Sequence, residues 1–188
     1  MSNFRIWFFR ALVIITAGLL ILSWFMPWWT AYIEATHIPN TIVIHPYGLE
    51  NNMGTFDYFF TTSEMMPGFF TPLMWIYFVL VIAALLIGTW VKNKDISLFK
   101  RKFNLSRWLI GIVGFSYIVV VVLAYVVASI KTAGFDLPFV GRTYLMLDWA
   151  EQSWVDARLR FGYWLACGIG PFLIILALLR NKIIGKTK

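Results

Sequence analysis

Two histidines, His37 and His45, lie in one polar stretch of the chain, and Met65 and Met66 follow further along it. The same stretch carries the acidic residues Glu34, Glu50, Asp57 and Glu64. Imidazole nitrogen combined with thioether sulfur suits copper, especially Cu(I), and carboxylates admit harder metal ions. The spacing matches no compact metal motif, so ordinary loop polarity and interfacial packing compete with this interpretation. His37, His45, Met65 and Met66 are therefore candidate metal ligands, with copper as the candidate cofactor.

The sequence carries no signature of a common catalytic centre. It has no P-loop, GxSxG or HExxH motif, and its only cysteine, Cys167, lies in an apolar run without a neighbouring base. Neither histidine lies in an apolar run, which excludes a haem held by two histidines inside a helical bundle. Asp156, Arg158 and Arg160 are interpreted as part of a solvated, partly paired rim. No residue is therefore a candidate catalytic or cofactor-binding residue.

Composition places the chain in the membrane class. Of its 188 residues, 60% are apolar, 19% aromatic and only 13% charged, whereas about a quarter of a soluble domain is charged. Runs long enough to cross about 30 Å of hydrocarbon lie at about 8–29, 72–91, 108–130 and 161–179. The sequence therefore predicts an all-α membrane protein, a four-helix transmembrane bundle forming a single membrane domain over residues 1–188.

The basic residues predict the topology. Lysine and arginine are absent between Arg10 and Lys92, and twelve of the sixteen lie near the two chain ends or in the segment 92–107. Basic residues stay on the cytoplasmic side of a membrane, so we expect a cytoplasmic (plasma) membrane protein with both termini and a basic inner loop, 92–107, inside. The outer loops, 30–71 and 131–160, then hold eight of the nine acidic residues.

The net charge of +7 follows from the same bias. Anionic lipids on the inner side of the bilayer are the expected partners of the basic segments. Nucleic acid is not an expected partner, because retention of basic residues on the cytoplasmic side explains the excess of positive charge.

Local patterns predict a small fold outside the membrane. Thr41–His45 is β-branched and predicts a strand, Pro46–Gly48 a turn, and Thr55–Thr61 a second strand. A helical turn is expected at Thr62–Met66. The first outer loop should therefore form a small β-containing extracytoplasmic cap. In the second outer loop, Asp148–Trp154 predicts an amphipathic helix at the membrane interface.

Two residue types in and around the apolar runs carry structural information. Small residues predict where helices pack together, and tryptophans predict where the helices meet the membrane interface. Small residues four positions apart predict helix-packing faces, since close helix approach in lipid needs them; they are Ala84, Gly88, Ala124, Ala128, Gly162, Ala166 and Gly170. Tryptophans near the ends of the runs and in the outer loops predict membrane-interface anchors; these are Trp28, Trp29, Trp90, Trp108, Trp149 and Trp154.

Three features together resemble small four-span membrane proteins of the claudin-like tetraspan type. They are a first run that ends in Pro27-Trp28-Trp29, a long β-prone outer loop, and a last run that opens with Phe161–Ala166. The resemblance implies a left-handed four-helix bundle with an extracytoplasmic cap and a tendency to assemble with itself or with partners. The chain departs from claudins where Gly48-Leu49 is followed by Glu50, and in having no cysteine in this loop.

Three functions remain open at this point. The central parts of the spans contain no histidine, aspartate, glutamate, lysine or arginine, which argues against a pump, because proton and ion paths need such groups at membrane depth. The leading hypothesis is a non-catalytic integral membrane subunit or scaffold of a larger assembly, such as a respiratory or oxidase-type complex. The alternatives are a copper-handling or monooxygenase-associated protein that uses the outer His and Met residues, and a small-solute transporter that acts as an oligomer.

Overall fold

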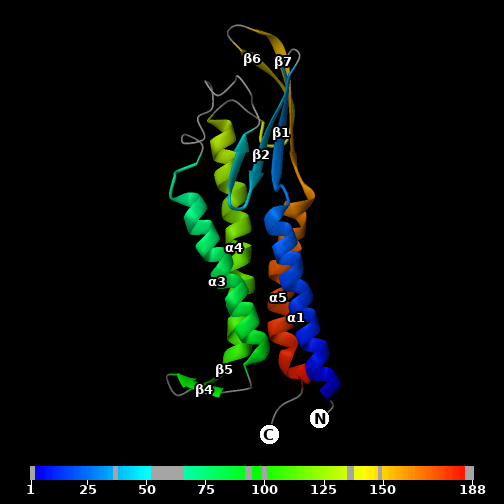
Figure 1. Cartoon of the computed structure of the whole chain (residues 1–188), viewed down its shortest axis with the longest axis vertical. Helices are drawn as coiled ribbons and strands as arrows, with labels where there is room; N and C mark the ends of the chain where they lie inside the picture. Colours follow the sequence, from blue (N-terminus) through cyan, green and yellow to red (C-terminus); the bar gives the residue numbers. More distant parts are fainter. Residues whose placement is uncertain are drawn as a thin grey trace. The chain divides into compact units, whose positions relative to one another are not determined.

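A computed structural model describes residues 3–35, 38–51, 66–91, 95–98, 101–134, 138–147 and 150–184. Its long helices, labelled as in Figure 1, are α1 (Asn3–Phe25), α3 (Phe70–Trp90), α4 (Leu105–Ala133) and α5 (Phe161–Ile184). Its strands are β1 (Trp29–Ala35), β2 (Ile38–His45), β3 (Gly48–Asn51), β4 (Asp95–Leu98), β5 (Arg101–Asn104), β6 (Gly141–Leu147) and β7 (Ala150–Leu159).

Four of the helices are long and apolar enough to cross a membrane, which confirms the four helices expected from the apolar runs. The boundaries differ in places. The first helix starts earlier than expected, at Asn3, and ends at Phe25 instead of near Trp29. It ends there because Pro27 disfavours a helical conformation at the preceding residue. In the basic segment that follows α3, the structure adds an antiparallel hairpin of β4 and β5.

The chain divides into two compact units. The helical unit comprises residues 1–22, 76–120 and 165–188, and the sheet unit comprises residues 23–75 and 121–164. Both units are discontinuous in sequence, and each of the four long helices contributes residues to both.

Within the helical unit, each helix contacts two others, so the four form a closed ring. The Ser106 hydroxyl of α4 donates a hydrogen bond to the Gly88 carbonyl of α3. Helices α4 and α5 meet at Gly114 and Gly170, where a Cβ on Gly114 would lie 2.9 Å from the Gly170 carbonyl oxygen. Arg10 of α1 lies over the Trp90 ring of α3. Arg180 of α5 lies over the ring of Phe9 in α1, which closes the ring of four helices.

The sheet unit contains a five-stranded antiparallel sheet in the order β3-β2-β1-β7-β6. Strands from two distant segments join side by side in it, because β1 pairs with β2 on one edge and with β7 on the other (Figure 1). The strand expected at Thr41–His45 is confirmed as part of β2, and the expected turn at Pro46 and Tyr47 joins β2 to β3. The expected strand at 55–61 and residues 62–65 of the expected helical turn lie outside the described residues.

The helix predicted at Asp148–Trp154 is wrong, because residues 150–159 form strand β7. Its side chains alternate, with Val155 and Ala157 buried and Arg158 exposed. That period of two fits a strand with one covered face. The buried face of the sheet forms a hydrophobic core of Trp29, Ala31, Ile33, Ile42, Val155 and Ala157.

Candidate functional site

The face of the sheet opposite this core combines arginines with aromatic side chains. We call it the arginine–aromatic face; its residues are Thr30, Tyr32, Arg142, Tyr144, Trp154, Asp156, Arg158 and Arg160. Strand pairing aligns them in rows, since Arg158 pairs with Thr30 and Asp156 pairs with both Tyr32 and Arg142. Trp154 pairs with Tyr144 in the next row. Three strands, β1, β7 and β6, therefore build one continuous surface, which Arg160 extends beyond the end of β7.

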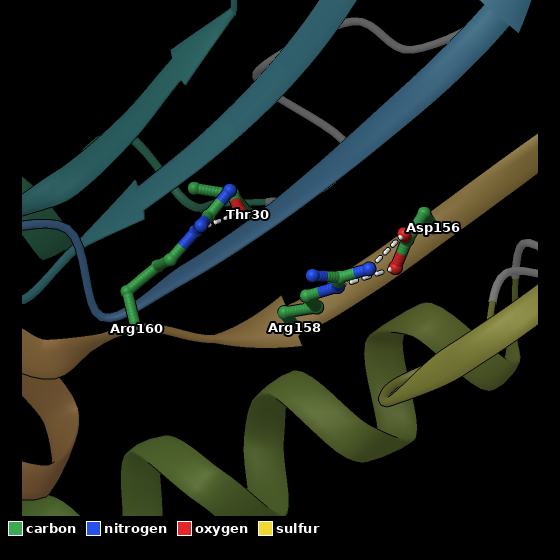
Figure 2. Close-up of polar contacts among 4 residues, drawn as sticks. All are labelled: Thr30, Asp156, Arg158 and Arg160. Carbon is green, nitrogen blue, oxygen red and sulfur yellow. Dashed lines mark hydrogen bonds and ion pairs between the residues drawn. The ribbon is translucent and has the colours of Figure 1, made fainter.

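Asp156 and Arg158 form a two-pronged ion pair on this face (Figure 2). The Arg158 Nε donates to Asp156 Oδ1 at 2.8 Å, and its Nη2 donates to Oδ2 at 2.6 Å. These hydrogen bonds, followed by the nearby charges of Arg158, Arg142 and Arg160, hold the pKa of Asp156 below its ordinary value. The Arg158 side chain is still 66% exposed. The pair is therefore ionised at neutral pH and accessible from solvent.

Arg160 is held differently, because it has no carboxylate partner among the described residues. Its Nε donates to Thr30 Oγ1 at 2.6 Å (Figure 2), and its backbone N–H donates to the Trp28 carbonyl at 2.9 Å. The hydroxyl fixes one edge of the guanidinium without neutralising its positive charge. Arg160 is exposed and directly precedes α5, so this charge lies where the sheet joins a candidate membrane span.

The aromatic side chains of the face are accessible as well. Tyr32 and Tyr144 are 42% and 50% exposed. The Arg142 guanidinium lies 4.7 Å from the centre of the Trp154 ring, a cation–π arrangement, and Tyr144 packs against the same indole. Planar rings and a stacked guanidinium lose little conformational freedom on contact with another molecule. This part of the face is consequently a pre-ordered, amphipathic surface.

The charge of the face is opposite to that of its unit. The sheet unit has four basic and eight acidic residues, a net charge of −4. Three of those four basic residues, Arg142, Arg158 and Arg160, belong to the arginine–aromatic face. Asp156 belongs to the face as well, and the strand register places a second acidic residue, Glu34, opposite Trp154. The three arginines outnumber these two acidic residues, so the face carries a small net positive charge within an acidic unit and suits an acidic partner.

The predicted metal ligands are only partly visible. His45 ends β2, and its buried ring stacks on Tyr47 with ring centres 5.0 Å apart. Its Nε2 lies 3.5 Å from Glu50 Oε2, while its Nδ1 has no hydrogen-bond partner among the described residues. Met66 is half-buried, and His37 and Met65 lie outside the described residues. In the ranges that the structure describes, no three His, Cys, Asp or Glu residues are grouped to hold a metal ion.

An aromatic cluster surrounds this histidine and attaches the β2–β3 turn to the helices. The Tyr47 ring contacts the rings of Trp24 and Phe25 in α1 and of Trp75 in α3. Burial, and then the negative charge of Glu50, raise the pKa of the Tyr47 phenol. These contacts explain His45 as a packed side chain of the sheet unit.

The predicted packing residues lie at several contacts. Gly162 approaches the Pro27 carbonyl, where an added Cβ would lie at 2.6 Å. Gly88 and Gly170 are at the helix contacts described above, and Ala166 is buried. Ala84, Ala124 and Ala128 are half-buried. Gly114, which was not among the predicted packing residues, also lies at the contact with α5, and its spacing from Gly111 is the signal that could have indicated it.

The predicted interface tryptophans divide into two groups. Trp28 and Trp29 are buried, Trp28 against Tyr163 and Trp29 against Phe139. Trp90 and Trp108, near the ends of α3 and α4, are exposed. The remaining members are Trp154, on the arginine–aromatic face, and Trp149, which lies outside the described residues.

Comparisons of the chain with protein-family models, curated proteins and solved structures find no match. The class of the protein therefore follows from its own fold. Four long apolar helices and a small β-sheet define a multi-pass membrane protein.

Proposed function

We propose that the protein is a non-catalytic subunit or scaffold of a larger membrane assembly, and that it binds its partner through the arginine–aromatic face. The partner would be the extracytoplasmic part of another membrane protein that presents carboxylates. In this proposal the four helices cross the cytoplasmic membrane and the sheet lies on its outer side.

The observation that carries the proposal is the composition of an exposed sheet face. Protein interfaces are enriched in Tyr, Trp and Arg, and the residues that dominate binding energy are drawn from the same types. The face displays Tyr32, Tyr144 and Arg158 to solvent, beside the stacked Arg142 and Trp154. Complementary charge would direct an acidic partner to this face instead of to the acidic remainder of the sheet unit.

The outer position of the sheet is supported by the distribution of charge. The helical unit has twelve basic residues and one acidic residue, Asp95, a net charge of +11. The sheet unit carries −4, which together give the +7 of the whole chain. Cytoplasmic segments retain lysine and arginine, so the acidic sheet unit is the part expected outside.

The test is native mass spectrometry of the protein extracted in mild detergent from its own membrane. We expect the wild-type chain to carry a stoichiometric partner. Arg142→Glu reverses a charge at an exposed position of the arginine–aromatic face and should reduce the retained partner about tenfold or more, as for a residue central to binding.

The matched control is Lys131→Glu, the same charge reversal at an exposed residue of α4 in the same unit. It should leave the partner bound. A wild-type protein that is purified without any other chain would refute the subunit proposal. Equal loss of partner in both variants would refute the role of the arginine–aromatic face while leaving the subunit proposal intact.

A further inference from the structure

A second arginine site, at the half-buried Arg10, lies in the helical unit on α1 and α3. The guanidinium carbon of Arg10 is 5.6 Å from the centre of the Trp7 ring and 5.3 Å from that of the Trp90 ring. Trp7 precedes Arg10 by one helical turn, and Trp90 is the last residue of α3. Both indoles are 59% exposed. Arg10 is thus a cation between two tryptophans that are open to the surroundings.

The Arg10 guanidinium lies over the two indoles, and among the described residues no carboxylate lies within ion-pair distance of it. The whole helical unit contains one acidic residue, Asp95, against twelve basic ones. A guanidinium that uses its flat faces against aromatic rings retains its N–H donors at the edge for an acceptor. The site is therefore ready for an anion from outside the unit.

Depth in the membrane selects the kind of anion. Tryptophan side chains concentrate at the level of the lipid head groups, and Arg10 lies about 10 Å along α1 from its first described residue, Asn3, at 1.5 Å per residue. An arginine held between Trp7 and Trp90 would be at that same level. The anion most abundant there is the phosphate of a phospholipid, and arginine binds phosphate through paired N–H donors.

We infer that Arg10, Trp7 and Trp90 form a binding site for the phosphate of an anionic phospholipid. The indoles hold the guanidinium at head-group depth, and its N–H edge binds the lipid. This inference rests on the helices crossing a bilayer and is independent of the arginine–aromatic face. The site is also separate from the basic segment 92–107, where the sequence led us to expect diffuse attraction of lipid.

The experiment measures lipid retained by the full-length protein. Wild-type and variant proteins are purified in mild detergent with equal amounts of phosphatidylglycerol and phosphatidylcholine, and the bound lipids are counted by native mass spectrometry. We expect preferential retention of phosphatidylglycerol by the wild type and about a tenfold lower affinity in Arg10→Gln, as for the loss of one charge-assisted hydrogen-bonding group.

Arg5→Gln is the matched control, because it removes the same charge from an exposed position on the same helix. It should leave retention within about twofold of wild type. Arg10→Lys keeps the charge but loses the planar donors, and it should reduce affinity about threefold. If Arg10→Gln does not fold, Arg10→Lys still tests whether the Arg10 guanidinium binds the lipid.

Three results would overturn the inference. They are wild-type retention in both Arg10 variants, an equal loss in Arg5→Gln, and full displacement of phosphatidylglycerol by millimolar inorganic phosphate. The last result would assign the site to soluble anions. The lipid site and the proposed function are tested by different measurements, namely retained lipid and retained protein partner. A variant that loses phosphatidylglycerol but keeps its protein partner therefore bears on the lipid site alone.

Discussion

Asp156 controls how positive the arginine–aromatic face is. Its carboxylate neutralises part of the charge of the three arginines and fixes the orientation of Arg158 through two hydrogen bonds. Because Tyr32 and Arg142 lie beside it in the same cross-strand row, its protonation state affects the centre of the face. The charge presented to an acidic partner therefore depends in part on the protonation of Asp156.

Arg158→Gln should raise the pKa of Asp156 toward the ordinary aspartate value, because the largest cause of the lowered pKa is the hydrogen bonding from Arg158. A carboxylate whose folded pKa is lowered stabilises the fold above its unfolded pKa, near 3.9, and loses this contribution as pH falls through the folded value. The variant should accordingly lose less stability than wild type on acidification below about pH 4.

Titration of the Asp156 carboxyl carbon by NMR, in detergent micelles, would measure this change. Lys131→Gln serves as the control, since it removes a positive charge from the same unit but not from the arginine–aromatic face, and it should leave the Asp156 pKa unaltered. An Asp156 pKa that is the same in wild type and Arg158→Gln would contradict the interpretation of the pair.

At the level of elements, the crossing of α4 and α5 depends on glycine. Gly114 and Gly170 face one another so closely that a Cβ on Gly114 would lie 2.9 Å from the Gly170 carbonyl oxygen and 3.0 Å from the Ile174 backbone nitrogen. Both neighbours are backbone atoms and cannot rotate away. In lipid there is no hydrophobic force that drives helices together, so close backbone packing of this kind stabilises their association instead.

Gly114→Ala should therefore destabilise the protein by about 1–3 kcal/mol, the usual cost of overpacking. Gly168→Ala is the matched control on α5, because nothing lies within 4 Å of the added Cβ. Alanine in a helix is favoured over glycine by about 0.5–1 kcal/mol, so the control should be neutral or slightly stabilising. Thermal unfolding in detergent compares the two, and equal midpoints would show that the helices can separate without cost.

The sequence predicted the helices far better than the sheet. A helix that crosses a membrane satisfies its backbone within one continuous segment, so an apolar run indicates it locally. A strand needs partners, and β1 pairs with β7 far along the chain, with Thr30 opposite Arg158. The side-chain hydrogen bond just beyond β7, from Arg160 to Thr30, joins residues 130 positions apart. No local sequence pattern in β1 predicts that its partner is β7.

In β7, the sequence contains a period-two alternation that indicates a strand, but the segment was predicted to be a helix. Trp154, Asp156 and Arg158 alternate with Val155, Ala157 and Leu159, which is the period of a strand. The aromatic and acidic residues around Asp148–Trp154 suggested an amphipathic helix instead. The ion pair of the candidate site was partly anticipated, because Asp156 and Arg158 were expected in a paired rim. Tyr32, Arg142 and Tyr144 gained significance only through the strand register.

At the level of the whole molecule, the two units carry opposite charge, +11 and −4. In a bilayer this asymmetry acts during insertion, because basic segments resist translocation and acidic ones contribute little. The proposed topology, with the sheet unit outside, is a consequence of that asymmetry and can be tested directly.

Single cysteines in a Cys167→Ser background should react from opposite sides of the membrane. Gly68→Cys is exposed and its side chain has open space in the sheet unit, and Lys182→Cys is exposed in the helical unit. A membrane-impermeant maleimide added to intact cells should label position 68, and it should label position 182 only after permeabilisation. Labelling of position 182 in intact cells would contradict the topology.

The place of β1 inside the sheet has a consequence for biogenesis. While the chain is being synthesised, β1 can pair with β2 soon after both emerge, but its other edge stays open until β7 is made. An open strand edge readily pairs with other chains. Because β7 directly precedes α5, the sheet can close only after the first three long helices have been synthesised. A chain that stops before β7 would therefore leave one edge of β1 unpaired and open to association with other chains.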